Sequence, residues 1–298
     1  MFNTIQSKVP NLFRDFFLTK NKNVKVKVAI QGIEGSNHDK VVRDFIAQPT
    51  EIIACLSFNA LVQSVVSQEA DYGIMAIENS IAGSILPNYA LISDKNLQIT
   101  AEYYLDIKHN LVALNNQNLE DIRSVRSHQM AFLQCGDFFS KHAELKLVED
   151  VDTALPAKQI AEKHKAFTAA IVPDGTAELF GLQVLKPNIQ DHNLNSTRFV
   201  KIENKPITSF DDSADKASIR FELEHEPGSL FKVLELLQKH NVNMTKIQSI
   251  PTPKSKWNYA FYIDMIFPNE CDILQVCDQL QKITHHFKNL GIYKQAKK

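Results

Sequence analysis

Glycine, cysteine and net charge are all scarce in this sequence of 298 residues. Glycine occurs 9 times, about 3% of the chain against a usual frequency of about 7%, which excludes collagen-like and linker-like chains. The four cysteines, Cys55, Cys135, Cys271 and Cys277, lie far apart and form no Cys-x-x-Cys pair. The sequence supports neither a zinc ribbon nor a dense disulfide framework, and we expect a protein of the reducing cytoplasm.

Charge of one sign and long apolar runs are missing as well. The chain has 33 Lys and Arg against 34 Asp and Glu, a net charge of -1, so attraction to nucleic acid or to an anionic membrane is not expected. Arg14 and Asp15 interrupt the apolar patch at 12–18, which excludes a signal-peptide core and a membrane span. We interpret residues 1–23 as an N-terminal extension.

The first part of the chain alternates strand and helix patterns. At roughly 150 residues per domain, the length of 298 residues predicts two domains and is sufficient for hydrophobic cores. A strand pattern at 24–30 runs through a glycine turn into a helix pattern at 39–46, and a buried strand is predicted at 72–77. This alternation predicts an α/β lobe with a parallel sheet.

A second α/β lobe is predicted after a strand pattern at 99–107. It comprises strands at 122–125, 145–148 and 169–172, a helix at 129–143, a helix after Thr153, and a short helix ending at Gly181. We expect the chain to cross between the lobes near residues 100 and 185. The two lobes together form a domain over residues 24–203.

The polar stretch at 204–215 is interpreted as a linker. Residues 216–296 then follow the order βαββαβ, with strands at 217–223, 243–251 and 258–267, two amphipathic helices, and a last segment near Gly291. This order predicts a ferredoxin-like α+β domain.

Two turns at predicted strand ends are candidate sites. The segment 32–36 lacks the Lys-Ser/Thr of a phosphate-binding loop, but a helix N-terminus there could hold a carboxylate; an ordinary turn is equally compatible. Glu78, Asn79 and Ser80 follow the predicted strand at 72–77, where ligands of open α/β sheets bind. Helix capping is the alternative for Asn79 and Ser80, as it is for Thr153.

The segment Asn195-Ser196-Thr197-Arg198-Phe199 is interpreted as a loop that suits an aromatic-sized anion. It combines hydroxyl donors, a guanidinium and an aromatic ring. The alternative is a solvated Arg198 beside a buried Phe199. We expect no metal, because the only adjacent histidines, His285 and His286, have no metal-site spacing.

Taken in order, these segments resemble the prephenate dehydratase family with its C-terminal ACT regulatory domain. The resemblance spans about residues 26–290. The matching segments are 32–36, 70–73, Glu78-Asn79-Ser80 with Gly83, 107–111, Ser127-His128, Gln134-Cys135, Asp152-Thr153-Ala154, Thr197-Arg198-Phe199, 226–231 and 245–247.

The resemblance implies a catalytic domain of two lobes, like a type II periplasmic binding protein, with the active site in the cleft. The reaction it implies is the decarboxylative dehydration of prephenate to phenylpyruvate, by a carbon–oxygen lyase of phenylalanine biosynthesis that uses no cofactor. Thr197 would donate to the departing hydroxyl. Asn79, Ser80 and Gln134 would complete the catalytic set, and the substrate-binding set would be Glu78, Ser127, Thr153, Arg198 and Phe199, with Arg198 holding a carboxylate.

The resemblance also implies L-phenylalanine as an effector and pairing of ACT domains, in a homodimer or homotetramer. The expected effector residues are Gly228, Leu230, Asn243 and Ser249. Gln248 and Ile250 stand where the family usually has Glu and Arg, so altered phenylalanine control is an alternative. Two other functions stay open, an arogenate dehydratase and a non-catalytic amino-acid sensor with the same fold.

Overall fold

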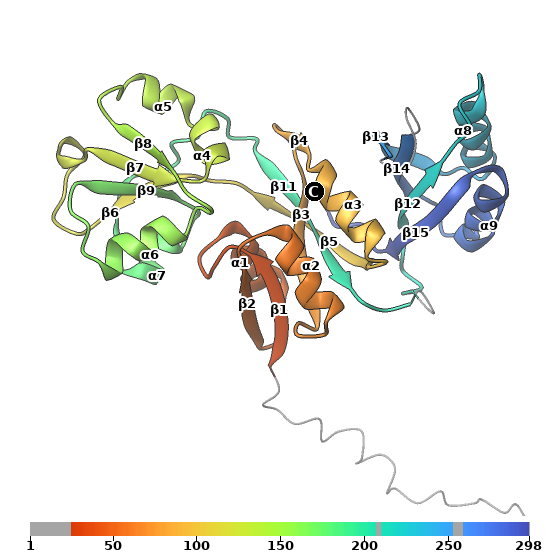
Figure 1. The fold of residues 1–298 in the computed structure, drawn as a ribbon, viewed down its shortest axis with the longest axis horizontal. Coiled ribbons are helices and arrows are strands. Elements are labelled where there is room, and N and C mark those ends of the chain that lie inside the picture. The colour runs from red at the N-terminus through yellow and green to blue at the C-terminus, as the bar shows by residue number, and fades with distance from the viewer. Residues whose placement is uncertain (1–24, 207–209, 253–258, 298) are drawn as a thin grey trace, which may run out of the picture.

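The computed structural model describes residues 25–206, 210–252 and 259–297. The expected extension at 1–23 lies outside these residues. Three sheets organise the chain (Figure 1), and the first lobe lies between the second lobe and the C-terminal domain. None of the described helices is both long and apolar enough to cross a membrane.

The first lobe has strand order β2-β1-β3-β11-β5, with β4 paired to β3. β1, β2 and β3 are parallel, whereas β11 runs antiparallel to both of its neighbours. Its elements are β1 (Val26–Gln31), α1 (Asn37–Phe45), β2 (Thr50–Cys55), α2 (Phe58–Val66), β3 (Tyr72–Asn79), β4 (Gly83–Ser84), α3 (Leu86–Asp94), β5 (Gln98–Asp106) and β11 (Ser196–Glu203).

The second lobe has strand order β10-β6-β9-β7-β8. The chain enters it between Asp106 and Asn110 and returns between Lys186 and Ser196. Its elements are β6 (Asn110–Ala113), a 3-10 helix (Leu119–Asp121), β7 (Ser124–Ser127), α4 (Gln129–Leu133), α5 (Gly136–Ser140), β8 (Lys146–Glu149), α6 (Leu155–Glu162), β9 (Thr168–Val172), α7 (Thr176–Phe180) and β10 (Gln183–Lys186). Two lobes joined by two crossings confirm the fold expected of a type II binding protein.

Two expectations for these lobes need correction. The helix expected over 129–143 is two short helices, because the Asp191 carboxylate accepts from the backbone N–H groups of Gly136 and Asp137 and starts α5 separately. The segment 195–199, expected to be a loop, enters β11, which lies in the sheet between β3 and β5. A strand alternates its side chains between two faces, so this correction changes where Thr197 and Arg198 point.

The C-terminal domain has an antiparallel sheet of order β13-β14-β12-β15. Its elements are β12 (Lys216–Glu222), α8 (Ser229–Lys239), β13 (Asn243–Pro251), β14 (Tyr259–Ile266), α9 (Ile273–Ile283) and β15 (His285–Tyr293). The order βαββαβ confirms the ferredoxin-like prediction. One face of this sheet packs on α8 and α9 around Phe221, Val233 and Leu280.

The other face of this sheet packs on the first lobe. Tyr262, Leu290 and Tyr293 belong to one hydrophobic cluster with Tyr89 and Ile99 of the first lobe. β15 lies beside β5 so closely that a Cβ atom at Gly291 would lie 2.1 Å from the carbonyl oxygen of Ile99. Only glycine fits there.

Candidate active site

A cleft of about 900 Å³ opens between the two lobes. The first lobe contributes side chains of β3 and β11 to its wall, and the second lobe contributes the starts of α4 and α6. Its lining includes the polar and aromatic residues His38, Phe58, Asn79, His109, His128, Gln134, Asp150, Asp152, Thr153, Thr197 and Phe199. The cleft therefore brings together four residues expected from the sequence with Thr197, namely Asn79, Gln134, Thr153 and Phe199.

A β-bulge aligns the first two of these residues. Thr197 pairs with Asn79 and Arg198 with Glu78, but Phe199 pairs with Ala76, so Ile77 is an extra residue on β3. The bulge turns Asn79 to the cleft face and Glu78 to the opposite face, reversing the alternation set by the first part of β3. Bulges commonly redirect side chains beside active sites.

Asn79 has a fixed orientation because two backbone groups hold its carboxamide oxygen. The N–H groups of Ile81 and Ala82 donate to Asn79 Oδ1 at 3.0 and 2.8 Å. Its Nδ2 therefore donates to Thr197 Oγ1 at 2.9 Å and to Asn195 Oδ1 at 2.7 Å. A hydroxyl that accepts from Asn79 keeps its own hydrogen for another acceptor, so Thr197 can donate into the cleft.

The chain of hydrogen bonds continues into the second lobe, and the donor and acceptor roles are fixed there too. Asn195 Nδ2 donates to Gln134 Oε1 at 2.9 Å, and His109 Nε2 lies 2.8 Å from that oxygen. Because a carboxamide oxygen only accepts, His109 carries its proton on Nε2 and leaves Nδ1 as an acceptor. This Nδ1 is buried and has no hydrogen-bond partner among the described residues. Burial lowers the pKa of His109, although the Gln134 contact opposes this, so its ring is neutral.

Two aromatic rings and a second histidine form an inner wall of the cleft. His38 Nε2 accepts from the Ala76 N–H at 3.3 Å, and its ring meets Phe199 edge-on at 5.0 Å and Phe58 at 5.6 Å. Burial lowers the pKa of His38 to about 3. His38 is therefore neutral, and Phe199 lies where an aromatic ring could pack against it.

The cleft can offer an anion the N-termini of helices but no cationic side chain from its described lining residues. Of the described residues that line it, none is Lys or Arg. The N-termini of α1, α2 and α6 border the cleft instead. Exposed N–H groups and the positive end of the helix dipole favour a carboxylate at such positions.

Thr153 does not cap α6, which corrects the capping alternative. Asp152 Oδ1 accepts from the N–H groups of Ala154 and Leu155 at 2.7 and 2.6 Å. Burial raises the pKa of Asp152, an effect that these two backbone hydrogen bonds oppose. Thr153 is left half-buried in the cleft wall with its hydroxyl available to a ligand.

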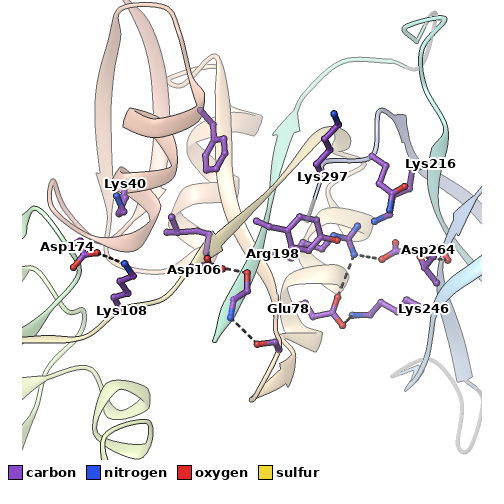
Figure 2. A pocket seen from close by; sticks show the side chains of 17 residues that line it. Lys40, Glu78, Asp106, Lys108, Asp174, Arg198, Lys216, Lys246, Asp264 and Lys297 are labelled. Atoms are coloured by element: carbon purple, nitrogen blue, oxygen red, sulfur yellow. Dashed lines mark hydrogen bonds and ion pairs between the residues drawn. The ribbon is translucent and has the colours of Figure 1, made fainter. Parts of the chain in front are cut away.

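Arg198 and Glu78 do not line the cleft. Both line a second cavity of about 740 Å³ on the other side of β11 (Figure 2), between the first lobe and the C-terminal domain. Arg198 is only 4% exposed and is bonded to Glu102 and Asp264. The structure contradicts the expectation that Arg198 holds a substrate carboxylate, because strand alternation turns it away from Thr197.

The two predicted serines also lie outside the cleft wall. Ser80 Oγ donates to the Leu194 carbonyl at 3.2 Å and accepts from the Ser196 N–H at 2.9 Å, and it lines the second cavity. Ser127 is fully buried and donates to the Ile171 carbonyl at 3.0 Å. Both hydroxyls therefore hold the backbone of the site instead of facing a ligand.

The four expected effector residues lie in two places of the C-terminal domain. Gly228 precedes α8 with φ +86°, and Leu230 lines a cavity of about 370 Å³ beside Phe261. Asn243 and Ser249 are exposed on the edge strand β13. Among the described residues of one copy, the cavity lined by Leu230 includes neither Asn243 nor Ser249.

Sequence reasoning gave no role to three residues that line the cleft, His38, His109 and Asp152. Asn195, which is buried and links Asn79 to Gln134, was noted only as part of the expected loop. His109 and Asp152 lie in segments that carried the family resemblance, so their positions were visible but their roles were not. His38 has no sequence signal beyond its place in a helix beside a glycine turn. Asn195 directly precedes β11, in the segment that was interpreted as a loop.

Comparisons with known proteins identify the family of both domains. The prephenate dehydratase family profile matches residues 28–207, and the ACT domain profile matches residues 217–270. The chain is 35% identical over 280 residues to the chloroplastic arogenate dehydratase/prephenate dehydratase 2 of Arabidopsis thaliana, covering 90% of this chain and 73% of that protein.

Two solved structures share the fold of the whole chain. One is the prephenate dehydratase of Arthrobacter aurescens in complex with L-Phe, with a TM-score of 0.81 and 27% identity over 91% of this chain and 90% of that one. The other, GqqA, described as a novel type of quorum quenching acylase, has a TM-score of 0.80 and 27% identity over 91% and 98%. By its family profile and its relative above 30% identity, the chain belongs to the prephenate dehydratase family and carries a C-terminal ACT domain.

Proposed function

We propose that the protein converts prephenate to phenylpyruvate, water and carbon dioxide. The observation that carries the proposal is the hydrogen bond from Asn79 to Thr197, which leaves the threonine hydrogen free to be donated to a ligand. A departing hydroxyl needs such a donor. The reaction makes the protein a carbon–oxygen lyase, and the chemistry needs no cofactor.

The reaction is a fragmentation driven by aromatisation. The bond between the ring and its carboxylate breaks to give carbon dioxide, and its electron pair enters the ring. The ring hydroxyl leaves as hydroxide and takes up one proton to become water. Thr197 stabilises the departing oxygen by donating its hydrogen bond, which suits a weak acid better than full ionisation.

A cleft without cations suits this bond cleavage. A Lys or Arg beside the ring carboxylate would stabilise the charged ground state and so oppose loss of carbon dioxide. Neutral donors fix the substrate instead, and we assign Gln134 and Thr153 to this role with the N-termini of α1 and α2. Phe199 and His38 would pack against the substrate ring.

A specific observation supports arogenate as a second candidate substrate. Arogenate has an ammonium group where prephenate has a keto oxygen. The carboxylates of Asp150 and Asp152 line the cleft, and a carboxylate can pair with an ammonium group. Asp150 is already bound to Arg126 at 2.7 Å, so Asp152 is the candidate partner.

Acyl transfer by Thr197, suggested by the name of GqqA, is not favoured by this geometry. A threonine nucleophile needs a general base that removes its proton. Thr197 Oγ1 instead meets an N–H donor, Asn79 Nδ2.

For regulation, we propose L-phenylalanine as the effector, bound between paired ACT domains. Gly228 and Leu230 of one copy would meet Asn243 and Ser249 on the edge strand of another. This arrangement makes the protein at least a homodimer, with a homotetramer formed if catalytic domains pair too. Four free cysteines support the reducing cytoplasm as its compartment.

The direct experiment gives the purified chain prephenate or arogenate. Phenylpyruvate is measured by its absorbance in alkali, and phenylalanine, the product from arogenate, by chromatography. Turnover of prephenate at the higher kcat/KM supports the proposal, and preference for arogenate supports the second candidate. Absence of both products, with phenylalanine binding by calorimetry, would show a non-catalytic sensor.

A further inference from the structure

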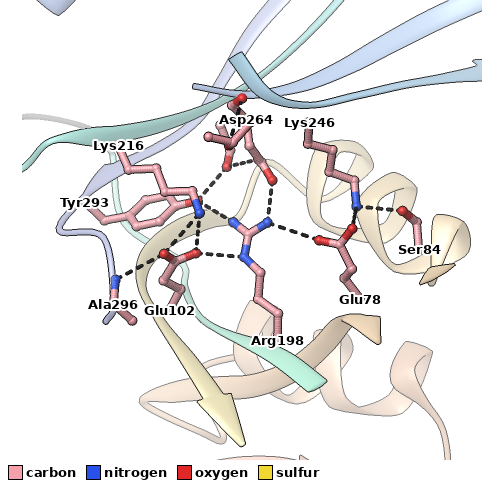
Figure 3. A network of polar contacts seen from close by, with 11 residues as sticks. Glu78, Ser84, Glu102, Arg198, Lys216, Lys246, Asp264, Tyr293 and Ala296 are labelled. Atoms are coloured by element: carbon pink, nitrogen blue, oxygen red, sulfur yellow. Dashed lines mark hydrogen bonds and ion pairs between the residues drawn. The ribbon is translucent and has the colours of Figure 1, made fainter. Parts of the chain in front are cut away.

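Three adjacent strands of the first lobe present charged side chains to the ACT sheet. They are Glu78 on β3, Arg198 on β11 and Glu102 on β5 (Figure 3). Arg198 Nε lies 2.7 Å from Glu102 Oε2, and Arg198 Nη1 lies 3.6 Å from Glu78 Oε2. The guanidinium thus links the two carboxylates on its neighbouring strands.

Each strand of the ACT sheet contributes one side chain that contacts one of these three. Asp264 on β14 binds the Arg198 guanidinium, and Tyr293 on β15 accepts from Arg198 Nη2 at 2.9 Å. Lys216 on β12 donates to Glu102 at 2.8 and 3.0 Å. Lys246 on β13 donates to Glu78 at 2.9 Å and to Ser84 at 2.6 Å.

This network, formed by Glu78, Glu102, Arg198, Lys216, Lys246, Asp264 and Tyr293, is mostly buried and its charges balance. Arg198, Glu102, Lys216 and Asp264 are each less than 5% exposed. Burial would raise the pKa of Asp264, but Arg198 and a hydrogen bond from Ser218 hold it below its usual value. Buried ion pairs tolerate little displacement, because a partner moved away leaves an uncompensated charge.

On both β3 and β11, a member of the network is the direct neighbour in sequence of a residue that faces the cleft. Arg198 follows Thr197, and Glu78 precedes Asn79, and the same bulge sets which member of each pair faces which site. A shift of the Arg198 main chain therefore changes the direction in which Thr197 donates. The seven members of the network do not line the cleft. Lys246 also donates to Ser84, which does line it, so β4 is a second connection between the network and the cleft wall.

We propose that Arg198 and Glu78 are positioning residues, through which the seating of the ACT sheet sets the alignment of Thr197 and Asn79. The inference rests on the proposed function, because it concerns the donor in that reaction. The same contacts couple an effector to the cleft. A ligand that shifts the ACT sheet would displace Arg198 through its ion pair with Asp264 and Glu78 through its ion pair with Lys246.

The two main variants of the test change only ACT residues in the full-length chain. Asp264→Asn keeps the shape of the side chain but removes the negative charge that pairs with Arg198. Lys246→Met keeps a side chain of similar length but removes the positive charge that pairs with Glu78. Asp278→Asn and Lys239→Met are the matched controls, because these exposed side chains lie on α9 and α8. Lys246→Met also guards against misfolding, since Glu78 is 35% exposed and tolerates the loss.

Two readouts separate positioning from mere attachment of the domain. We expect kcat on prephenate to fall about 3- to 30-fold in Asp264→Asn and Lys246→Met, with KM within about twofold, because coupling through such networks has this size. Amide hydrogen exchange in 196–203 should become faster in the same variants. Arg198→Lys combined with Asp264→Asn should be less than additive.

Wild-type kcat and wild-type exchange in folded Asp264→Asn and Lys246→Met would overturn the inference while leaving the proposed function intact. A rise in KM alone would overturn it too, because the network would then act on binding. A wild-type chain without turnover would overturn the proposed function. The exchange in 196–203 would still decide whether the network holds β11.

Discussion

Thr197 and Arg198 are neighbours in β11, yet their side chains belong to different sites. The Thr197 hydroxyl accepts from Asn79 in the cleft, while the Arg198 guanidinium binds Glu102 and Asp264 at the ACT interface. One strand thus carries the proposed hydrogen-bond donor on one face and the inter-domain ion network on the other. The segment Thr197-Arg198-Phe199 therefore joins the proposed active site to the domain interface.

Replacing Nδ2 of Asn79 by an oxygen tests whether Asn79 donates to Thr197. In Asn79→Asp the two backbone donors at residues 81 and 82 keep their acceptor, but the N–H donor to Thr197 is gone. The threonine hydrogen then turns towards the new carboxylate. We expect kcat to fall about 10²- to 10³-fold, the usual cost of losing one such donor. Unchanged kcat would contradict the assigned polarity.

Gly291 tests the seating of the ACT sheet. In Gly291→Ala the new methyl group would meet the Ile99 carbonyl at 2.1 Å, so β15 must move away from β5. We expect a loss of about 1–3 kcal/mol in the free energy of unfolding, as for other overpacked sites. Gly136→Ala is the matched control in urea denaturation, because its nearest atom would be 3.4 Å away; equal stability of the two variants would refute the close approach.

Ile250 stands where the family usually has Arg, and the structure gives it a packing role. It contacts the hydrophobic cluster shared by the first lobe and the ACT sheet. Ile250→Arg should therefore lower the free energy of unfolding by about 1–3 kcal/mol. Ile250→Leu should be close to wild type. Calorimetric melting of both variants checks the prediction, and a stable Ile250→Arg would show that this position has room for the family's charge.

Acid sensitivity provides a separate test, through His38. Its folded pKa of about 3 lies below its unfolded value, so the unfolded chain binds more protons between pH 6.5 and 3. Stability from this group is present above pH 6.5 and is lost as the pH falls. Between pH 7 and 5 the wild type should lose about 2 kcal/mol more than His38→Gln, which keeps an acceptor for Ala76. Parallel urea titrations at both pH values that show equal losses would contradict the buried neutral histidine.

Much of the fold could be predicted from the sequence because apolar periodicity reports which face of an element is buried. The strand at 72–77 and the βαββαβ order after residue 216 are examples. β11 was missed because its first residues, Ser196 to Arg198, are all polar, although the strand lies in a sheet interior. Their burial follows from neighbouring strands and ACT contacts, which no local pattern records.

The candidate site was predicted only in part, because some side-chain directions also depend on pairing between strands. Asn79, Gln134, Thr197 and Phe199 meet in the cleft, as the resemblance implied. Glu78 and Arg198 do not, because a bulge at Ile77 and strand alternation set their directions. A bulge is a property of the pairing between two strands, so it could not be seen in either segment alone. Asp152 took the capping role that was considered for Thr153, because its carboxylate reaches two N–H groups.

The central claim is that the Thr197 hydroxyl assists departure of the substrate hydroxyl, and a pair of variants tests it most directly. Thr197→Val keeps the shape and removes the donor, whereas Thr197→Ser keeps the donor. With prephenate, or with arogenate if that is the preferred substrate, we expect Thr197→Val to lower kcat by about 10²- to 10⁴-fold. Thr197→Ser should stay within about tenfold of wild type. A folded Thr197→Val with wild-type kcat would contradict the account.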